Sequence, residues 1–84
     1  MIHLPQIWDL LQLHMNTDAW YPIETIYQMI EEHYQLDDED FEPQAPTSSI
    51  PKWKRNVRNV LQYRKTKGDL LWDVYGNYKI GNMK

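Results

Sequence analysis

The sequence predicts an α+β fold in which two helices, joined by a short strand, precede a third helix and a C-terminal β-hairpin. Apolar residues recur at helical spacing twice within the first 34 positions and again in an acid-free basic segment at 50–67. Beyond Gly68, two short apolar runs flank a turn. A chain of 84 residues has the length of one domain, which we expect to span residues 1–84.

The first two helices are predicted over about 5–15 and 22–34. Pro5 and Pro22 suit a first helical turn, where a proline removes no helical hydrogen bond. Residues 19–21 are expected to be extended, because a residue before proline avoids helical angles. The apolar stripes consist of Leu4, Ile7, Trp8, Leu11 and Met15 in the first helix and Ile23, Ile26, Tyr27, Ile30 and Tyr34 in the second.

The third helix is predicted over about 50–67, with Ser48 or Ser49 as its cap and Pro51 in its first turn. Gly68 is expected to end it, since glycine adopts the left-handed conformation of a helix stop. One face is apolar and should pack into the core, which makes Trp53 a core tryptophan first and a base-stacking one second. This face consists of Ile50, Trp53, Val57, Val60, Leu61 and the stem of Arg64.

Residues 36–49 are predicted to be irregular, with one helical turn capped by Asp37 or Asp38, because Pro43 and Pro46 exclude a longer helix. The segment of about 70–80 is predicted as a hairpin. Its strands are LLWDV and YKI, and its turn is Tyr75–Asn77. This order of elements is that of a winged helix-turn-helix, in which the third helix enters the major groove and the hairpin is the wing.

The formal net charge of −3 conceals a strong separation of charge. Ten of the twelve acids precede residue 51, where there is no Lys or Arg, and seven of the nine basic residues lie between Lys52 and Lys67, where there is no acid. Such polarity favours an anionic partner for the basic helix. The alternative at this point is a solvated face that the acids of the same chain neutralise.

The outward face of the third helix carries the side chains that read DNA. Arginine pairs with guanine and Asn or Gln with adenine, while flanking Lys and Arg neutralise phosphates. We therefore predict that the partner is double-stranded DNA. The expected contacts are Lys52, Arg55, Asn56, Arg58, Asn59, Gln62 and Lys65, with Asn77 in the hairpin, and Trp53, Tyr63 and Tyr75 are candidates for a base or methyl pocket.

Other functional classes find little support. Without cysteine there is neither a disulfide nor a thiolate zinc site, and the three histidines lack ligand spacing. The alternating acids at 38, 40 and 42 lack the glycine and the distal glutamate of a calcium loop. Neither a glycine-rich phosphate loop nor a nucleophile elbow is present. We expect no enzyme activity, no metal and no cofactor. With no signal peptide and no apolar run of about 20 residues, we expect a cytoplasmic protein without membrane contact.

From Leu36 onward the sequence resembles the winged-helix domain of Mrr-type and related modification-dependent restriction endonucleases. The matching parts are the acidic LDDEDFEP, the segment SSIPKWKRNVRNVLQYRKTKGDLLWD, a turn with glycine, and YKI. The likeness covers roughly residues 20–80. It implies a DNA-binding domain that targets a separate nuclease domain, in cis or in trans. This chain has no nuclease domain, which is a departure from the family.

The resemblance also implies site residues. Some winged helices of this family read methylated bases, N6-methyladenine among them. The likeness assigns DNA contacts to Lys52, Trp53, Arg55, Asn56, Arg58 and Asn59, and to the hairpin near Tyr75 and Asn77. An alternative from a different class is a protein-interaction or inhibitor domain. In that case the acidic half would be the working surface and would mimic DNA.

Overall fold

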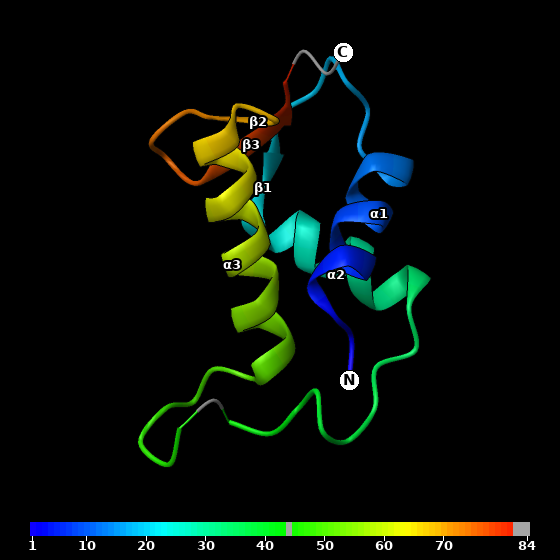
Figure 1. Ribbon diagram of the computed structural model, residues 1–84, viewed down its shortest axis with the longest axis vertical. Helices are drawn as coiled ribbons and strands as arrows, with labels where there is room; N and C mark the ends of the chain where they lie inside the picture. The colour runs from blue at the N-terminus through cyan, green and yellow to red at the C-terminus, as the bar shows by residue number, and fades with distance from the viewer. Residues whose placement is uncertain (44, 82–84) are drawn as a thin grey trace.

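The computed structural model describes residues 1–43 and 45–81, and within them three helices and an antiparallel sheet of three strands form an α+β fold (Figure 1). The class and the order of the elements are as the sequence predicts. The elements are α1 (Leu4–His14), β1 (Tyr21–Pro22), α2 (Ile23–His33), α3 (Lys52–Lys67), β2 (Leu70–Trp72) and β3 (Asn77–Ile80). None of the helices in the described residues is long and apolar enough to cross a bilayer.

The sheet has the order β1-β3-β2, so the last strand lies in the middle. Tyr78 of β3 is opposite Tyr21 on one side and Trp72 on the other. Pro22 is tolerated in β1 because this strand is at an edge, where a missing N–H costs no ladder bond. The two-residue strand therefore ties the start of α2 to the hairpin.

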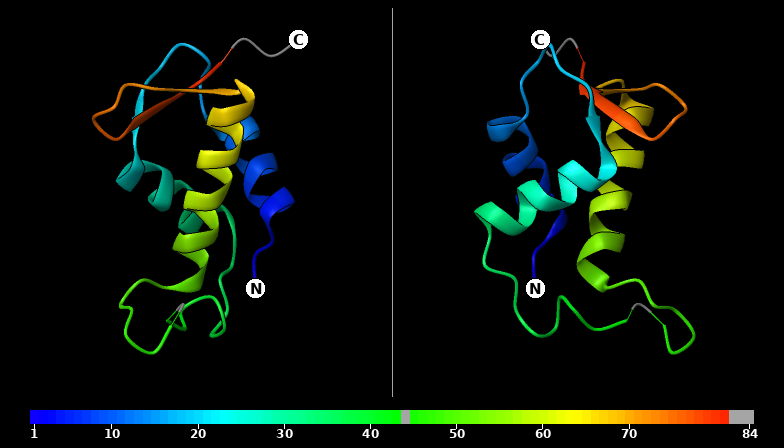
Figure 2. Two further views of the ribbon diagram at one scale, coloured as in Figure 1. Left: turned by 60° about the vertical axis from the view of Figure 1, so that its left-hand side comes forward. Right: turned by 180° about the vertical axis from the view of Figure 1, so that it is seen from behind.

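The core is formed by the three helices and by the inner face of the sheet, and α1 and α3 lie side by side across it (Figure 2). Trp53 is only 1% exposed, and its ring meets those of Tyr27 and Phe41 edge-on at centroid distances of 5.6 and 6.4 Å. The prediction that Trp53 packs in the core is confirmed. The other buried apolar residues include Ile7, Trp8, Leu11, Ile26, Ile30, Val57, Val60, Leu61, Leu70 and Ile80.

The start of α3 differs from the prediction. The helix begins at Lys52, Pro51 is its cap residue, and neither Ser48 nor Ser49 caps it. Instead the backbone N–H groups of Lys52 and Trp53 donate to the carbonyl oxygens of Glu42 and Asp40, at 2.9 and 3.1 Å. The acidic segment thus satisfies the first-turn donors that a serine would otherwise take. Ile50 lies outside the helix and is 37% exposed, so its placement in the core was wrong.

The acidic segment 37–42 forms the predicted helical turn, and Asp37 caps it. The N–H of Asp40 donates to Asp37 Oδ1 at 3.0 Å. Asp40 itself is fully buried, and its carboxylate accepts the N–H groups of Ile2 and Asp37, each at 2.9 Å. The charge of Asp40 is therefore used inside the molecule rather than on its surface.

The end of α3 is as predicted: Gly68 adopts a φ of 87°, which favours glycine, and its N–H caps the helix. In the hairpin that follows, the first strand is shorter than predicted and the second is one residue longer. Strand β2 ends at Trp72, so Asp73 and Val74 belong to the turn, and Asn77 begins β3 instead of closing the turn. The cause is the Asp73 side chain, which accepts N–H groups of the turn and so ends the ladder early.

Candidate nucleic-acid interface

Four of the predicted DNA contacts meet in one polar groove of about 350 Å³ beside α3. The four contacts lie within eight positions of α3 and are mostly three or four positions apart, which places them on one face of the helix. The far wall comes from the sheet. We call this feature the basic groove; it is lined by Ile50, Arg55, Arg58, Asn59, Gln62 and Tyr78.

The positive charge of the basic groove is not neutralised by acids in the described part of the chain. Of the basic residues of α3, Lys52 pairs with Glu42 at 3.1 Å and Arg64 with Asp69 at 2.8 Å. For Arg55, residues 1–43 and 45–81 offer no carboxylate at ion-pair distance, and the same holds for Arg58, Lys65 and Lys67. The groove can therefore attract an anion without first breaking an internal ion pair.

Tyr78 belongs to the basic groove although the sequence reasoning did not select it. Burial raises the pKa of its hydroxyl above the ordinary value of 10.0, and the nearby Arg58 guanidinium opposes that shift. The hydroxyl thus stays protonated at neutral pH and can donate a hydrogen bond to a phosphate or a base edge. Strand alternation was the available signal, because Tyr78 shares the inner face with the buried Ile80.

Two lysines near the C-terminal end of α3 lie over aromatic rings. Lys65 Nζ lies 4.3 Å from the centroid of the Trp72 ring, and Lys67 Nζ lies 5.7 Å from that of Tyr63. Both ammonium groups lie over a ring face, and the attraction between cation and ring offsets part of the entropy that a long side chain loses when it is ordered. Trp72 is 42% exposed and was not selected as a site residue from the sequence. Lys65, which the sequence suggested as a phosphate contact, is not among the residues that line the basic groove.

Besides Lys65, three predicted contacts lie outside the basic groove. Lys52 is engaged by Glu42 at the start of α3. Asn56 is turned toward the N-terminal segment, where its Nδ2 donates to the carbonyl oxygen of Ile2 at 3.4 Å. Asn77 lies in the hairpin with its amide bound to Asp73 Oδ2 at 2.6 Å. These three side chains have structural partners, and we remove them from the candidate interface.

The predicted pocket of Trp53, Tyr63 and Tyr75 is not formed. Trp53 is buried, and Tyr75 is at the hairpin turn. Tyr63 instead lines a separate apolar cleft of about 290 Å³ between α1 and α3. Asn59 lines this cleft as well as the basic groove, so its amide lies where the two meet. The remaining cleft residues are Leu4, Pro5, Val60 and Arg64.

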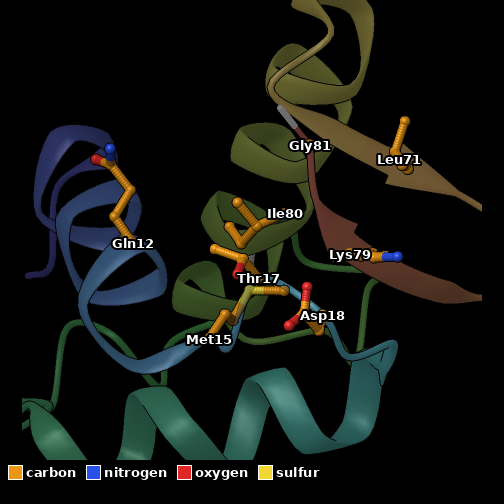
Figure 3. A pocket seen from close by; sticks show the side chains of 8 residues that line it. All are labelled: Gln12, Met15, Thr17, Asp18, Leu71, Lys79, Ile80 and Gly81. Atoms are coloured by element: carbon orange, nitrogen blue, oxygen red, sulfur yellow. The ribbon is translucent and has the colours of Figure 1, made fainter. Parts of the chain in front are cut away.

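A larger hollow of about 550 Å³ lies between the end of α1, the segment that follows it and the strands β2 and β3 (Figure 3). Its lining includes Leu71 and Lys79 of the strands and, on the side of α1, Gln12 and Met15. Lys79 lies between Tyr78 and Ile80, whose side chains are on the inner face of the sheet. Because side chains alternate along a strand, Lys79 is directed away from the basic groove. None of the predicted contacts lines this hollow. We therefore do not assign it to the interface.

The described residues contain no group of three or more His, Cys, Asp or Glu side chains that could hold a metal ion. The rings of His14 and His33 stack at 3.7 Å and 9°, face to face, so their nitrogens do not converge on one ion. The comparisons with known proteins do not add a function: no family model, curated protein or solved structure matches the chain. The chemistry of the basic groove is the ground for a functional proposal.

Proposed function

We propose that this protein is a winged-helix module that binds double-stranded DNA, with α3 as the recognition helix and the β2–β3 hairpin as the wing. The observation that carries the proposal is the basic groove. It combines two arginines, for which residues 1–43 and 45–81 offer no ion-pair partner, with two amide side chains on one exposed helix face. Guanidinium groups bind phosphates and guanine, and amides bind adenine, so this set matches a DNA duplex.

We further propose that the module targets rather than cuts. The six residues of the basic groove include no carboxylate that could hold a divalent ion beside a phosphate. A nuclease domain in cis or in trans would supply cleavage, in line with the resemblance to restriction-type enzymes. The alternative of an acidic working surface is weaker by one acid, since Asp40 is buried. Asp37 and Glu42 stay exposed but have partners in Met1 and Lys52.

A duplex that contains N6-methyladenine is the modified ligand that the site favours. The Asn59 amide lies at the boundary between the basic groove and the apolar cleft. An adenine edge held by this amide would direct an N6-methyl group toward Leu4, Val60 and Tyr63, where a methyl group gains by leaving water. Paired binding curves with methylated and unmodified duplexes test this, and equal affinities would remove methyl reading from the proposal.

The salt dependence of binding tests DNA binding itself. If about four basic residues contact phosphates, with Arg58, Lys65 and Lys67 among them, the slope of log K against log salt is about −3.6. Affinity for a labelled random duplex should then fall by about 150-fold between about 50 and 200 mM salt, measured by fluorescence anisotropy. If no binding is detected at the lower salt, the proposal is wrong and the acidic protein-interaction reading takes its place.

A pair of charge-matched variants separates groove contacts from the general field of the protein. Arg58→Gln should flatten the slope by about 0.9, which is the loss of one phosphate contact. Lys54→Gln is the control, because Lys54 lies over the rings of Tyr27 and Trp53, at 4.9 and 5.6 Å, and does not line the groove. It should leave the slope unchanged. Equal effects of the two variants would show that only net charge matters.

A further inference from the structure

The turn of the hairpin exposes two apolar side chains. Tyr75 is 86% exposed and Val74 is 64% exposed, and they are neighbours at the point where the chain reverses. We call these two residues the hairpin tip. Polar residues could form the same turn and would expose less apolar surface to water. The turn itself therefore does not require a valine and a tyrosine.

The turn is held in one conformation by Asp73. Its Oδ1 accepts the N–H groups of Tyr75 and Asn77, at 2.8 and 3.0 Å, and its Oδ2 accepts the Asn77 side-chain amide at 2.6 Å. The carbonyl oxygen of Gly76 also accepts the N–H of Ile23 at 3.2 Å, which fastens the turn to the start of α2. The hairpin tip is therefore presented in a fixed direction.

Val74 is strained within this turn. Its φ of 63° lies in the left-handed region, where a β-branched residue is a rare and costly occupant. Asparagine or glycine would adopt the same angle with less strain. A strained backbone that the surroundings hold in place is a feature of binding and switch sites, and it indicates that the valine side chain has a use outside the turn.

The hairpin tip lies beside the proposed interface. The hairpin meets α3 through Lys65, which lies over Trp72, and through Tyr78, which lines the basic groove. The turn, orange in Figures 1 and 2, projects away from the body of the molecule near the C-terminal end of α3. If the major groove of a duplex lies on the basic groove of the protein, the adjacent minor groove of that duplex comes to the hairpin tip.

We propose that Val74 and Tyr75 form an apolar wedge that enters the minor groove of the bound duplex and opens one base step. The inference rests on the DNA binding proposed above. Apolar side chains that enter the minor groove unstack bases, and flexible pyrimidine–purine steps open most readily. The ring of Tyr75 stacks on a base that the opening exposes, while Val74 fills the space between the separated base pairs.

Duplexes that carry 2-aminopurine at successive positions test the wedge, because this base fluoresces more strongly when it is unstacked. With the full chain, fluorescence should rise several-fold at one step beside the segment that α3 contacts. Tyr75→Ser should abolish the rise and weaken binding by about 5- to 150-fold, the value of one base–aromatic stack. Tyr75→Phe keeps the ring and should retain both effects. Leu13→Ser is the control, since Leu13 is a 75% exposed residue of α1.

Val74→Asn adds an opposing pair of readouts. Asparagine relaxes the backbone at a φ of 63°, so the melting temperature should rise while duplex binding weakens. If the full chain binds DNA with the expected salt dependence, yet no position brightens or Tyr75→Ser binds and brightens like the parent, the wedge is wrong and DNA binding stands. If the chain binds no duplex, both proposals fall.

Discussion

The carboxylate of Asp40 accepts the backbone N–H of Ile2 at 2.9 Å, although 38 positions separate the two residues. Asp40 also accepts the N–H of Asp37, and its carbonyl oxygen accepts the N–H of Trp53 at the start of α3. One buried acid therefore joins the N-terminal segment, the acidic turn and the helix that forms the basic groove. The position of the groove depends on this junction.

We expect Asp40→Ala to lower the free energy of unfolding by about 2–4 kcal/mol, because two N–H groups lose a buried acceptor. Urea denaturation followed by tryptophan fluorescence measures the change. Asp38→Ala is the matched control, since Asp38 is an exposed neighbour of the same charge, and it should stay within about 0.5 kcal/mol of the parent. Equal losses in both variants would mean that charge, and not the buried bonds, sets the stability.

Trp53→Ala should destabilise the fold by about 3–5 kcal/mol, because it removes the largest side chain of the core. This loss is a large part of the free energy of unfolding, which is about 5–15 kcal/mol for a typical protein. Thermal melting followed by circular dichroism measures the change in stability. Trp53→Phe should cost less, since it also removes an indole N–H for which the described residues offer no partner. A parent-like melting curve for Trp53→Ala, together with lost DNA binding, would place Trp53 in the interface instead.

The hairpin turn should lose stability in acid. Hydrogen bonds to the Asp73 carboxylate, above all from the Asn77 amide and then from the turn N–H groups, lower its pKa below the ordinary value of 3.8. A carboxyl with a lowered pKa in the folded state stabilises that state above its unfolded pKa and loses this effect as the pH falls through the folded pKa. The loss should therefore occur below about pH 4.

NMR titration of the Asp73 carboxyl and the Asn77 side-chain amide checks this expectation, because both signals should move together below pH 3.8. In Asn77→Ala the pKa of Asp73 should rise toward its ordinary value, since the largest cause of the shift is gone. Asn77→Ala should change DNA affinity only through the turn, in contrast to the contact first predicted for this side chain. An unchanged Asp73 pKa in this variant would show that the bond is not formed in solution.

The residues of the basic groove should divide into readers and positioners. Arg55→Ala or Asn59→Ala should cost about 1–3 kcal/mol on a selected site and little on random duplex, because we propose that these groove residues contact base edges. Lys65→Gln should weaken both duplexes alike and leave the sequence preference intact. Competition binding with selected and random duplexes separates the two classes. Uniform losses in all three variants would make α3 an electrostatic platform without base reading.

The helices could be predicted from the sequence because their apolar stripes depend only on local spacing. The same periodicity brought Arg55, Arg58, Asn59 and Gln62 together on one face, as the basic groove has them. The cap of α3 could not be predicted in this way. Its acceptors are backbone carbonyl oxygens of the acidic segment, and every residue type carries such an oxygen, so no sequence signal marks it.

Contacts that depend on strand register were also beyond local reasoning. Tyr78 and Trp72 reach the interface because they are paired across β2 and β3, and that register follows from a turn fixed by Asp73. The turn was placed too late in the sequence because Asn77 fits a turn by its composition. The role of its amide in binding Asp73 becomes apparent only when the strands are paired.

The bridge between Pro43 and Pro51 closes the base of the loop that leads into α3. Together with the bonds from Lys52 and Trp53 to the acidic segment, it holds both ends of this loop independently of what lies between them. A protein engineer therefore has an insertion point at Ala45–Ser49, where the described side chains are mostly exposed. Doubling the length of such a loop costs only about 0.6 kcal/mol in closure entropy. A fluorescent reporter or a nuclease inserted there would be attached next to α3 and would leave the helix in place.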